Sequence, residues 1–494
     1  MKSEQSANSL TDEIVEEPGG EFSNTKVYQH LISFITQVEA SQDARFRANL
    51  EILVQFMASL DPVWRLVQSS AFRVKLLKIS AILGISNDQR LRDELHKDDK
   101  DLAQLLVLVA SSDVYKKAVL RLKGGSAQNC IDLIQDILDK GSIPSGDEPS
   151  IMKARRLLVR LSEASDTLPS SLFIRGVSRL DKEATFGGTF GDIYRATFEG
   201  QTVALKRIRV FQRDSAQHKR FCREALLWQR LQSPFVLPFT GIDAESFPSF
   251  LCMVSPFMRH GTILKHLAEN GNANLETRLF EIAQGLAYLH SQNIIHGDLR
   301  GCNILVDDGW HACLADFGLA VFSDATGVTH TSHHGGSVRW MSPELHYPQS
   351  CGLENFQRTF ASDVYSFAFV CVELYTGKPP FSDISHDAAV MLRVIAKERP
   401  PRPCDVSGRT TMSDALWTLV QQCWSHDPAE RPSMAWVLEL MQDGNEELHL
   451  IPPSTYLQGL PNTPPGKKQS FQVHLSSRRR PKGPGTTVYQ TLSF

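Results

Sequence analysis

The sequence lacks the paired cysteines that a disulfide framework or a cysteine zinc site requires. Its nine cysteines are odd in number and widely scattered, and no two of them form a C-x-x-C pair. We therefore expect reduced, mostly buried thiols in a protein of the cytoplasm, with the nucleus as the alternative location. A chain of 494 residues can bury a sizeable core without disulfide support.

Long apolar runs are also absent. The longest stretches without charged or turn residues, such as residues 364–372, are much shorter than a membrane span. The N-terminus is rich in acidic residues, where a signal peptide would carry basic and then apolar ones. These absences predict a soluble protein with no membrane span.

The chain as a whole has no strong excess of one charge. Its net charge is −3, and its content of apolar residues, 42%, is typical of folded globular proteins. We therefore expect no nucleic-acid partner, because a polyanion would favour a basic surface. Residues 443–494 differ from the rest, since they are rich in proline and basic. They predict a disordered tail.

The composition changes along the first part of the chain and predicts separate regions. Residues 1–24 are acidic and poor in apolar residues, so we expect them to be disordered. In residues 25–165 apolar side chains recur every three or four positions, as in amphipathic helices. Asp61 and Pro62 are typical of a helix start. We predict an all-α helical bundle with a regulatory or interaction role, followed by a linker at 166–178.

Residues 179–442 begin with short β-like segments and continue as helices. Turn residues at Glu199 and Gly200 predict a β-hairpin, and the pattern that follows predicts a helix at 215–231. Further strands are expected at 235–242 and 250–255. This order predicts a small sheet followed by a larger helical part.

Several side chains of this region suit phosphate binding. The segment TFGGTFGDIY at 185–194 predicts a hairpin whose glycines let backbone N–H groups approach a phosphate chain. Lys206 ends the strand-like segment VALK, and Glu224 follows on the amphipathic helix, where a carboxylate can hold the lysine in place. A lysine at the end of a strand is more often simply solvated. The order in which these motifs occur, and not Lys206 alone, therefore supports phosphate binding.

Acidic and amide side chains follow in two later segments. In IIHGDLRGCNILV, apolar runs on both sides anchor a loop that presents Asp298 and Asn303. In LADFGLA, Asp316 stands at a strand end before a glycine turn. Two acids and an amide of this kind suit a magnesium ion that bridges phosphate oxygens.

Taken in order, these motifs resemble the catalytic domain of eukaryotic protein kinases, over residues 179–442. The resemblance implies an α+β, bilobal protein kinase fold, with a small β-rich N-lobe and a larger helical C-lobe, here preceded by the helical bundle. The segment WMSPE resembles the tyrosine-kinase-like group. The segments HGDLRGCNIL and LPSSLFIRGV are similar to kinases of mushroom-forming fungi.

The resemblance implies ATP and Mg²⁺ as cofactors and assigns roles to individual residues. Asp298 would accept the proton of the substrate hydroxyl, and Lys206, held by Glu224, would grip the α- and β-phosphates. The metal ligands would be Asn303 and Asp316. The residues that line the ATP site would be Gly187, Gly188, Gly191, Ile193, Ala204, Lys206, Ser255 as gatekeeper, Pro256, Met258 and Leu305.

The resemblance also implies structural roles. Glu344 would pair with Arg431, and Asp363 would brace the loop that carries the catalytic aspartate. Four rings would stack as a spine between the lobes: Trp228, Phe239, His296 and Phe317.

Two positions depart from the family pattern. Phe186 replaces the first glycine of the phosphate hairpin, which either weakens nucleotide binding or only alters the hairpin tip. Gly297 replaces the arginine that precedes the catalytic aspartate and normally contacts a phosphorylated activation loop.

These residues favour a protein kinase that transfers the γ-phosphoryl of ATP to serine or threonine hydroxyls of proteins. Arg300, which the resemblance places among the catalytic residues, and Ser337 both resemble the pattern of serine/threonine-specific kinases. Tyrosine or dual specificity stays open. One alternative is a pseudokinase scaffold that acts through conformation and partner binding. Another is that the helical region, through self-association or a protein partner, carries the main function.

Overall fold

The computed structural model describes residues 61–67, 89–188, 191–207, 215–248, 250–271, 274–323, 337–403 and 411–443. The predicted disordered segments, at 1–24 and after residue 443, lie outside the described residues, as do the first predicted helices of the bundle.

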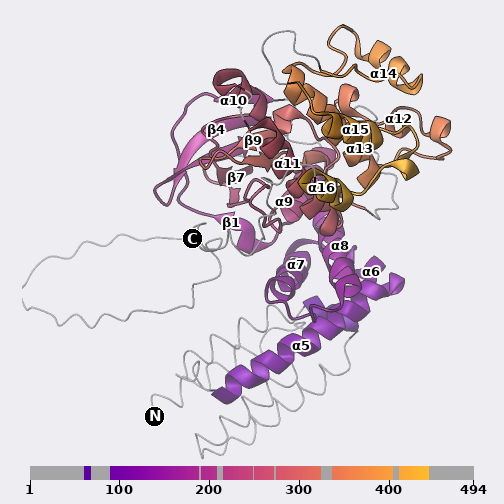
Figure 1. Ribbon diagram of the computed structural model, residues 1–494. Coiled ribbons are helices and arrows are strands. Elements are labelled where there is room, and N and C mark those ends of the chain that lie inside the picture. The colour runs from indigo at the N-terminus through magenta and orange to yellow at the C-terminus, as the bar shows by residue number, and fades with distance from the viewer. Residues whose placement is uncertain are drawn as a thin grey trace, which may run out of the picture. The chain divides into compact units, whose positions relative to one another are not determined.

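The described part of the N-terminal region is helical, as the sequence predicts. Asp61 Oδ1 accepts a hydrogen bond of 2.7 Å from the Val63 amide, which starts the helical segment at 62–67. The helices that follow are α5 (Gln89–Ser111), α6 (Asp113–Val119), α7 (Gly124–Asp139) and α8 (Glu148–Ser165). α8 packs against α5 and α7 (Figure 1). The three helices contribute fully buried aliphatic side chains such as Leu106, Ile131 and Leu161 to one core.

A twisted sheet follows. Its strands are β1 (Phe173–Ile174), β2 (Ser178–Arg179), β3 (Phe186–Gly188), β4 (Gly191–Phe198), β5 (Gln201–Arg207), β6 (Gly241–Asp243) and β7 (Cys252–Pro256). Their order is β1-β6-β7-β5-β4-β2, with β3 on β4, and every pair except β1–β6 is antiparallel. The predicted turn between β4 and β5 is confirmed, because Glu199 and Gly200 both have positive φ, at 48° and 79°, as a type I′ turn requires.

Two predicted element bounds in this lobe are wrong. The helix α9 covers Ser215–Trp228 and ends before residue 231. Of the strand expected at 235–242, only the last residues join the sheet, in β6. The segment before it bonds elsewhere, because the Leu237 amide donates to the Leu314 carbonyl at 2.8 Å and Pro238 has no amide to give to a sheet.

The larger lobe is mainly helical. Its helices are α10 (Ile263–Asn270), α11 (Leu275–Ser291), α12 (Pro343–His346), α13 (Phe360–Thr376), α14 (Asp387–Ile395), α15 (Asp414–Cys423) and α16 (Met434–Asp443). Short strand pairs join β8 (Ile294–Ile295) to β11 (Val321–Phe322) and β9 (Ile304–Val306) to β10 (Ala312–Leu314). The α+β, two-lobed fold that the resemblance implies is therefore confirmed, with helices preceding it.

Helix α13 lies at the centre of this lobe. Every residue from Ser362 to Tyr375 is buried, and α11, α15 and several turns pack around the helix. A capping box fixes its first turn, where Thr359 and Ser362 exchange side-chain-to-backbone hydrogen bonds. No helix within the described ranges is long and apolar enough to cross a membrane.

Candidate active site

The lysine and the two acids that the sequence singles out lie together between the lobes. Lys206 lies on β5 and Glu224 on α9, and the lysine Nζ is 2.6 Å from Glu224 Oε1. The same Nζ lies 2.8 Å from Oδ1 of Asp316, which precedes the 3₁₀ turn Phe317–Leu319. The ammonium group therefore bridges helix α9 and the segment Asp316-Phe317-Gly318, the DFG segment.

Burial and the close contacts shift the pKa values of the three groups in this cluster. The Glu224 side chain is only 2% exposed, and burial raises the pKa of its carboxyl group. Burial alone would lower the pKa of Lys206, yet Asp316 and Glu224 together raise it above its ordinary value. Burial also acts against the charged form of Asp316, but the Lys206 ammonium holds the pKa of this carboxyl below its usual value. The lysine is therefore a fixed positive charge, and Asp316 remains ionised at neutral pH.

The loop between β8 and β9 presents the predicted catalytic aspartate. Asn303 Nδ2 donates to the backbone carbonyl of Asp298 at 2.8 Å and to its Oδ2 at 3.1 Å. The Ser337 amide donates to Asp298 Oδ1 at 3.1 Å. Both carboxylate oxygens thus have a donor, so the orientation of this side chain is fixed before any substrate binds.

Asp363, on α13, braces this loop as the sequence predicts. Its Oδ2 accepts from the His296 amide at 2.8 Å and lies 3.0 Å from His290 Nε2. Its Oδ1 accepts from the Gly297 amide at 2.9 Å. Because α13 is buried, these bonds tie the catalytic loop to the most rigid part of the lobe.

A second buried acid supports the loop, and the sequence analysis did not identify it. Glu373 Oε2, on α13, accepts from the Gly301 amide and from Trp340 Nε1, each at 2.8 Å. Burial raises the pKa of this carboxyl to about 7. An acid inside the apolar helix FAFVCVELY is the signal that could have revealed it.

The four predicted rings contact one another in series across the lobes, but in T-shaped and tilted geometries and not as a parallel stack. Trp228, on α9, lies 5.3 Å from the Phe239 ring and 5.8 Å from Phe317, between ring centroids. Phe317 in turn lies 5.6 Å from His296. Trp228 Nε1 donates to the Leu237 carbonyl at 2.6 Å, which satisfies its polar atom within this series of rings. The position of α9 is thereby linked to that of the catalytic loop.

The phosphate hairpin differs from expectation at Phe186. This residue does not lie at the hairpin tip but on β3, paired with Ile193 of β4, and its side chain is exposed. Gly188 pairs with Gly191, and the tip residues 189–190 lie outside the described part. A strand position accepts a phenylalanine without strain, so the departure leaves the hairpin regular.

Residues predicted to contact the adenine lie on neighbouring strands. Ala204 on β5 faces Ser255 of β7 in the register, and Ile193 lies on β4, beside β5. Leu305 lies on β9 and bridges to Thr262 in the connection between the lobes. In that connection the Met258 amide has no backbone partner among the described residues, so it suits the edge of a nucleobase.

The donor chemistry of Asn303 and Asp316 fits magnesium. No three acidic, histidine or cysteine side chains gather into a metal cage in the described part. A magnesium ion on nucleotide phosphates needs only one or two protein ligands, however. Asn303 commits its amide nitrogen to Asp298, which leaves its side-chain oxygen as the ligand atom. The Ala315 amide donates to the Asn303 carbonyl at 2.9 Å, so the backbones of the two predicted ligands lie close together.

Arg300 is placed differently from the other predicted catalytic residues. Its guanidinium lies 6.0 Å from the centre of the Trp340 ring, a cation–π distance. The structure shows no ion pair between Arg300 and Asp298 among the described residues.

The backbone conformation and the close neighbours of Gly297 leave no room for a side chain at this position. Its φ is +77°, and a Cβ would lie 2.7 Å from Arg358 Cδ and 2.8 Å from the Leu319 carbonyl oxygen. The buried Arg358 donates from Nε to the Gly297 carbonyl at 3.1 Å. A guanidinium from the segment before α13 therefore fills the space beside the catalytic loop.

We expect Gly297→Ala to lower the free energy of unfolding by about 2–4 kcal/mol, since left-handed strain and a backbone clash act together. Gly352→Ala is the matched control, because Gly352 has a φ of +73° with nothing within 4 Å of its Cβ. Urea unfolding measures both variants. Equal losses of stability in the two would contradict the crowding at Gly297.

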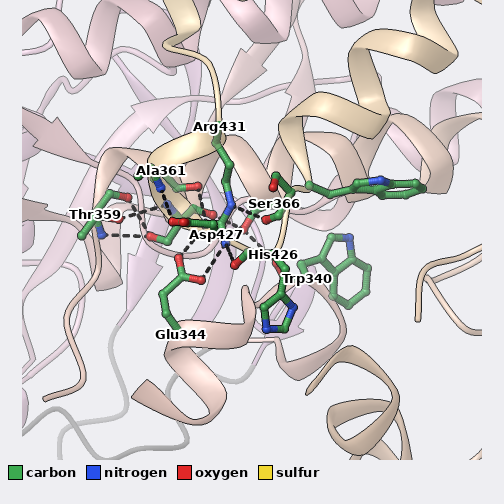
Figure 2. A network of polar contacts seen from close by, with 12 residues as sticks. Trp340, Glu344, Thr359, Ala361, Ser366, His426, Asp427 and Arg431 are labelled. Carbon is green, nitrogen blue, oxygen red and sulfur yellow. Dashed lines mark hydrogen bonds and ion pairs between the residues drawn. The ribbon is translucent and has the colours of Figure 1, made fainter. Parts of the chain in front are cut away.

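Glu344 and Arg431 form the buried ion pair that the sequence predicts (Figure 2). Arg431 Nη1 and Nη2 lie 2.6 and 2.7 Å from the two carboxylate oxygens, and both side chains are 0% exposed. Arg431 also donates to the carbonyls of Ser425, Ala361 and His426. The pair joins helix α12, which contains Glu344, to the segment before α16.

Comparison with known proteins agrees with this site. Residues 182–441 match the family described as protein tyrosine and serine/threonine kinase. The chain is 31% identical to the serine/threonine-protein kinase STY46 of Arabidopsis thaliana, over 53% of this chain and 43% of that protein. It is 30% identical to the serine/threonine/tyrosine-protein kinase HT1 of the same plant, over 52% of this chain and 64% of that protein.

A mouse relative, the serine/threonine-protein kinase TNNI3K, is 29% identical over 61% of this chain and 35% of that protein. The chain thus spans less than half the length of STY46. The family match covers more than half of this chain and includes every residue of the cluster around Lys206. The chain belongs to the protein tyrosine and serine/threonine kinase family.

Proposed function

We propose that the chain transfers the γ-phosphoryl group of ATP to serine or threonine hydroxyls of proteins. The observation that carries this proposal is the contact of Lys206 Nζ with both Glu224 and Asp316, because it places α9 and the DFG segment where nucleotide phosphates can be held. Magnesium, when bound, would neutralise charge on the β- and γ-phosphates, with Asn303 and Asp316 as its protein ligands.

In this proposal Asp298 orients the acceptor hydroxyl and takes its proton. The Ser337 amide and Asn303 Nδ2 hold the Asp298 carboxylate, so the acceptor hydroxyl meets a general base whose orientation is already fixed. Lys206 holds the α- and β-phosphates through its fixed positive charge. Met258 would bind the adenine edge through its amide, and Ile193, Ala204 and Leu305 would enclose the ring.

Serine or threonine specificity is supported by Arg300 and Ser337, and by relatives whose names are those of serine/threonine kinases. The test is phosphoamino acid analysis of proteins labelled by the full chain with radioactive ATP and magnesium. Phosphoserine and phosphothreonine are the expected products. Phosphotyrosine as the main product would overturn this assignment and leave the transfer itself intact.

The scaffold alternative rests on Phe186 alone, and its regular place on β3 gives that alternative no support. We further propose a cytoplasmic protein, with the nucleus as the alternative location. We also propose the domain limits: a helical region at 25–165, a linker at 166–178 and a kinase domain at 179–442. We propose further that the helical region binds a protein partner or associates with itself. The similarity to fungal kinases also stays a prediction.

A further inference from the structure

Helix α8 of the N-terminal region packs against α9, the helix that carries Glu224. The elements in most extensive contact with α9 are α8 and the Phe317–Leu319 turn. Their apolar residues belong to one continuous core, in which Leu158 and Leu161 of α8 and Phe221 and Ala225 of α9 are all buried. The position of α9 therefore depends on a part of the chain outside the family match.

Polar contacts with the helical region lie near both ends of α9. Asp166 Oδ1, after α8, lies 3.4 Å from Nδ1 of His218 near the start of α9. At the far end, Gln229 Nε2 donates to Gln135 Oε1 of α7 at 3.0 Å. His218 and Gln229, the residue that follows α9, are eleven positions apart, about 16 Å at 1.5 Å per residue. α9 is thus held at both ends by the helical region.

The strongest contact lies between these two. Arg223 Nε lies 2.6 Å from Glu163 Oε1 of α8, and the two side chains are only 25% and 18% exposed. Arg223 directly precedes Glu224, so successive residues of α9 point to different partners: one to α8 and the other to Lys206. A change at Glu163 therefore reaches the Lys206–Glu224 pair through a single turn of helix.

We propose that Glu163 is a positioning residue for catalysis, which holds α9 through Arg223 so that Glu224 reaches Lys206. This inference rests on the proposed kinase activity for its kinetic consequence, but its structural consequence is independent of that activity. α9 has two arrangements in this scheme, and the ion pair favours the one in which the lysine is held.

The test is a charge-swap cycle in the full chain, with Glu163→Arg, Arg223→Glu and the double variant. We expect each single variant to lower kcat/KM by about tenfold, which corresponds to about 1.4 kcal/mol and is typical of the coupling between two residues in contact. The swap should recover most of that loss. Hydrogen exchange of residues 215–228 should rise in the single variants and return towards the wild-type level in the swap.

Two further variants keep the test decisive. Arg160→Glu reverses an exposed charge on the same helix and should leave both readouts unchanged. Glu163→Gln removes only the charge, and it replaces Glu163→Arg in the test if that variant does not fold. The inference would be overturned if both Glu163 variants kept the wild-type hydrogen exchange and kcat/KM. It would also be overturned if the double variant were as impaired as the single variants. An inactive wild type would instead count against the proposed function, and the exchange data would still decide the role of Glu163.

Discussion

Asp298→Asn should lower the rate of phosphoryl transfer by about 10²–10⁴-fold, because an amide cannot accept the proton of the acceptor hydroxyl. The affinity for ATP with magnesium should stay within about twofold, since the carboxylate is placed to act on the hydroxyl and not on the nucleotide. Steady-state kinetics measures the first quantity and isothermal titration calorimetry the second. The expected result is a loss in kcat with little change in nucleotide binding.

Asp308→Asn is the matched control for this variant. Asp308 lies between β9 and β10, is 64% exposed on its side chain, and has Arg259 at 3.7 Å as its ionic partner. Its removal should change neither quantity, because an exposed pair contributes little. Equal turnover by Asp298→Asn and the wild type would show that another group receives the proton.

Arg431→Met should lower the free energy of unfolding by about 3–5 kcal/mol, the cost of leaving one member of a buried ion pair without its partner. Glu344 is 0% exposed in the pair, and methionine supplies neither charge nor donors. Three carbonyls would lose the guanidinium as well, at Ser425, Ala361 and His426. Urea unfolding followed by tryptophan fluorescence measures this loss.

A surface pair gives the comparison. Arg393 Nη1 lies 2.8 Å from Glu398 Oε2, a distance close to that in the buried pair, but the side chains are 50% and 49% exposed. Arg393→Met should therefore cost less than about 1 kcal/mol. A small loss in Arg431→Met, equal to that in Arg393→Met, would contradict the structural role of the buried pair.

The sequence predicted the parts of the site whose residues stand in short motifs. Lys206 lies one residue before the end of β5 and Asp316 directly before the turn Phe317–Leu319, so local pattern alone placed both near element ends. Long-range pairs such as Glu344 with Arg431 were predicted only through the family resemblance, because nothing in the local pattern links residues so far apart.

Other features depend on tertiary contacts that no local pattern reveals. The segment at 235–242 has the composition of a strand, but the backbones of Phe235 and Leu237 bond to Leu314 in the other lobe, and only its last residues join the sheet. Arg358 fills the space beside Gly297 from a segment about 60 residues away, and no local pattern links the two. The packing of α8 on α9 could not be predicted, since amphipathic helices alone do not identify their partners.

The most direct test of the account is transfer of radioactive phosphate from ATP to an added protein acceptor, by the wild type and by Asp316→Asn, with and without magnesium. We predict many turnovers by the wild type in magnesium, and almost none without the metal or in Asp316→Asn. The same low incorporation by the wild type and by Asp316→Asn, under all conditions, would contradict the claim that this site is an active kinase centre.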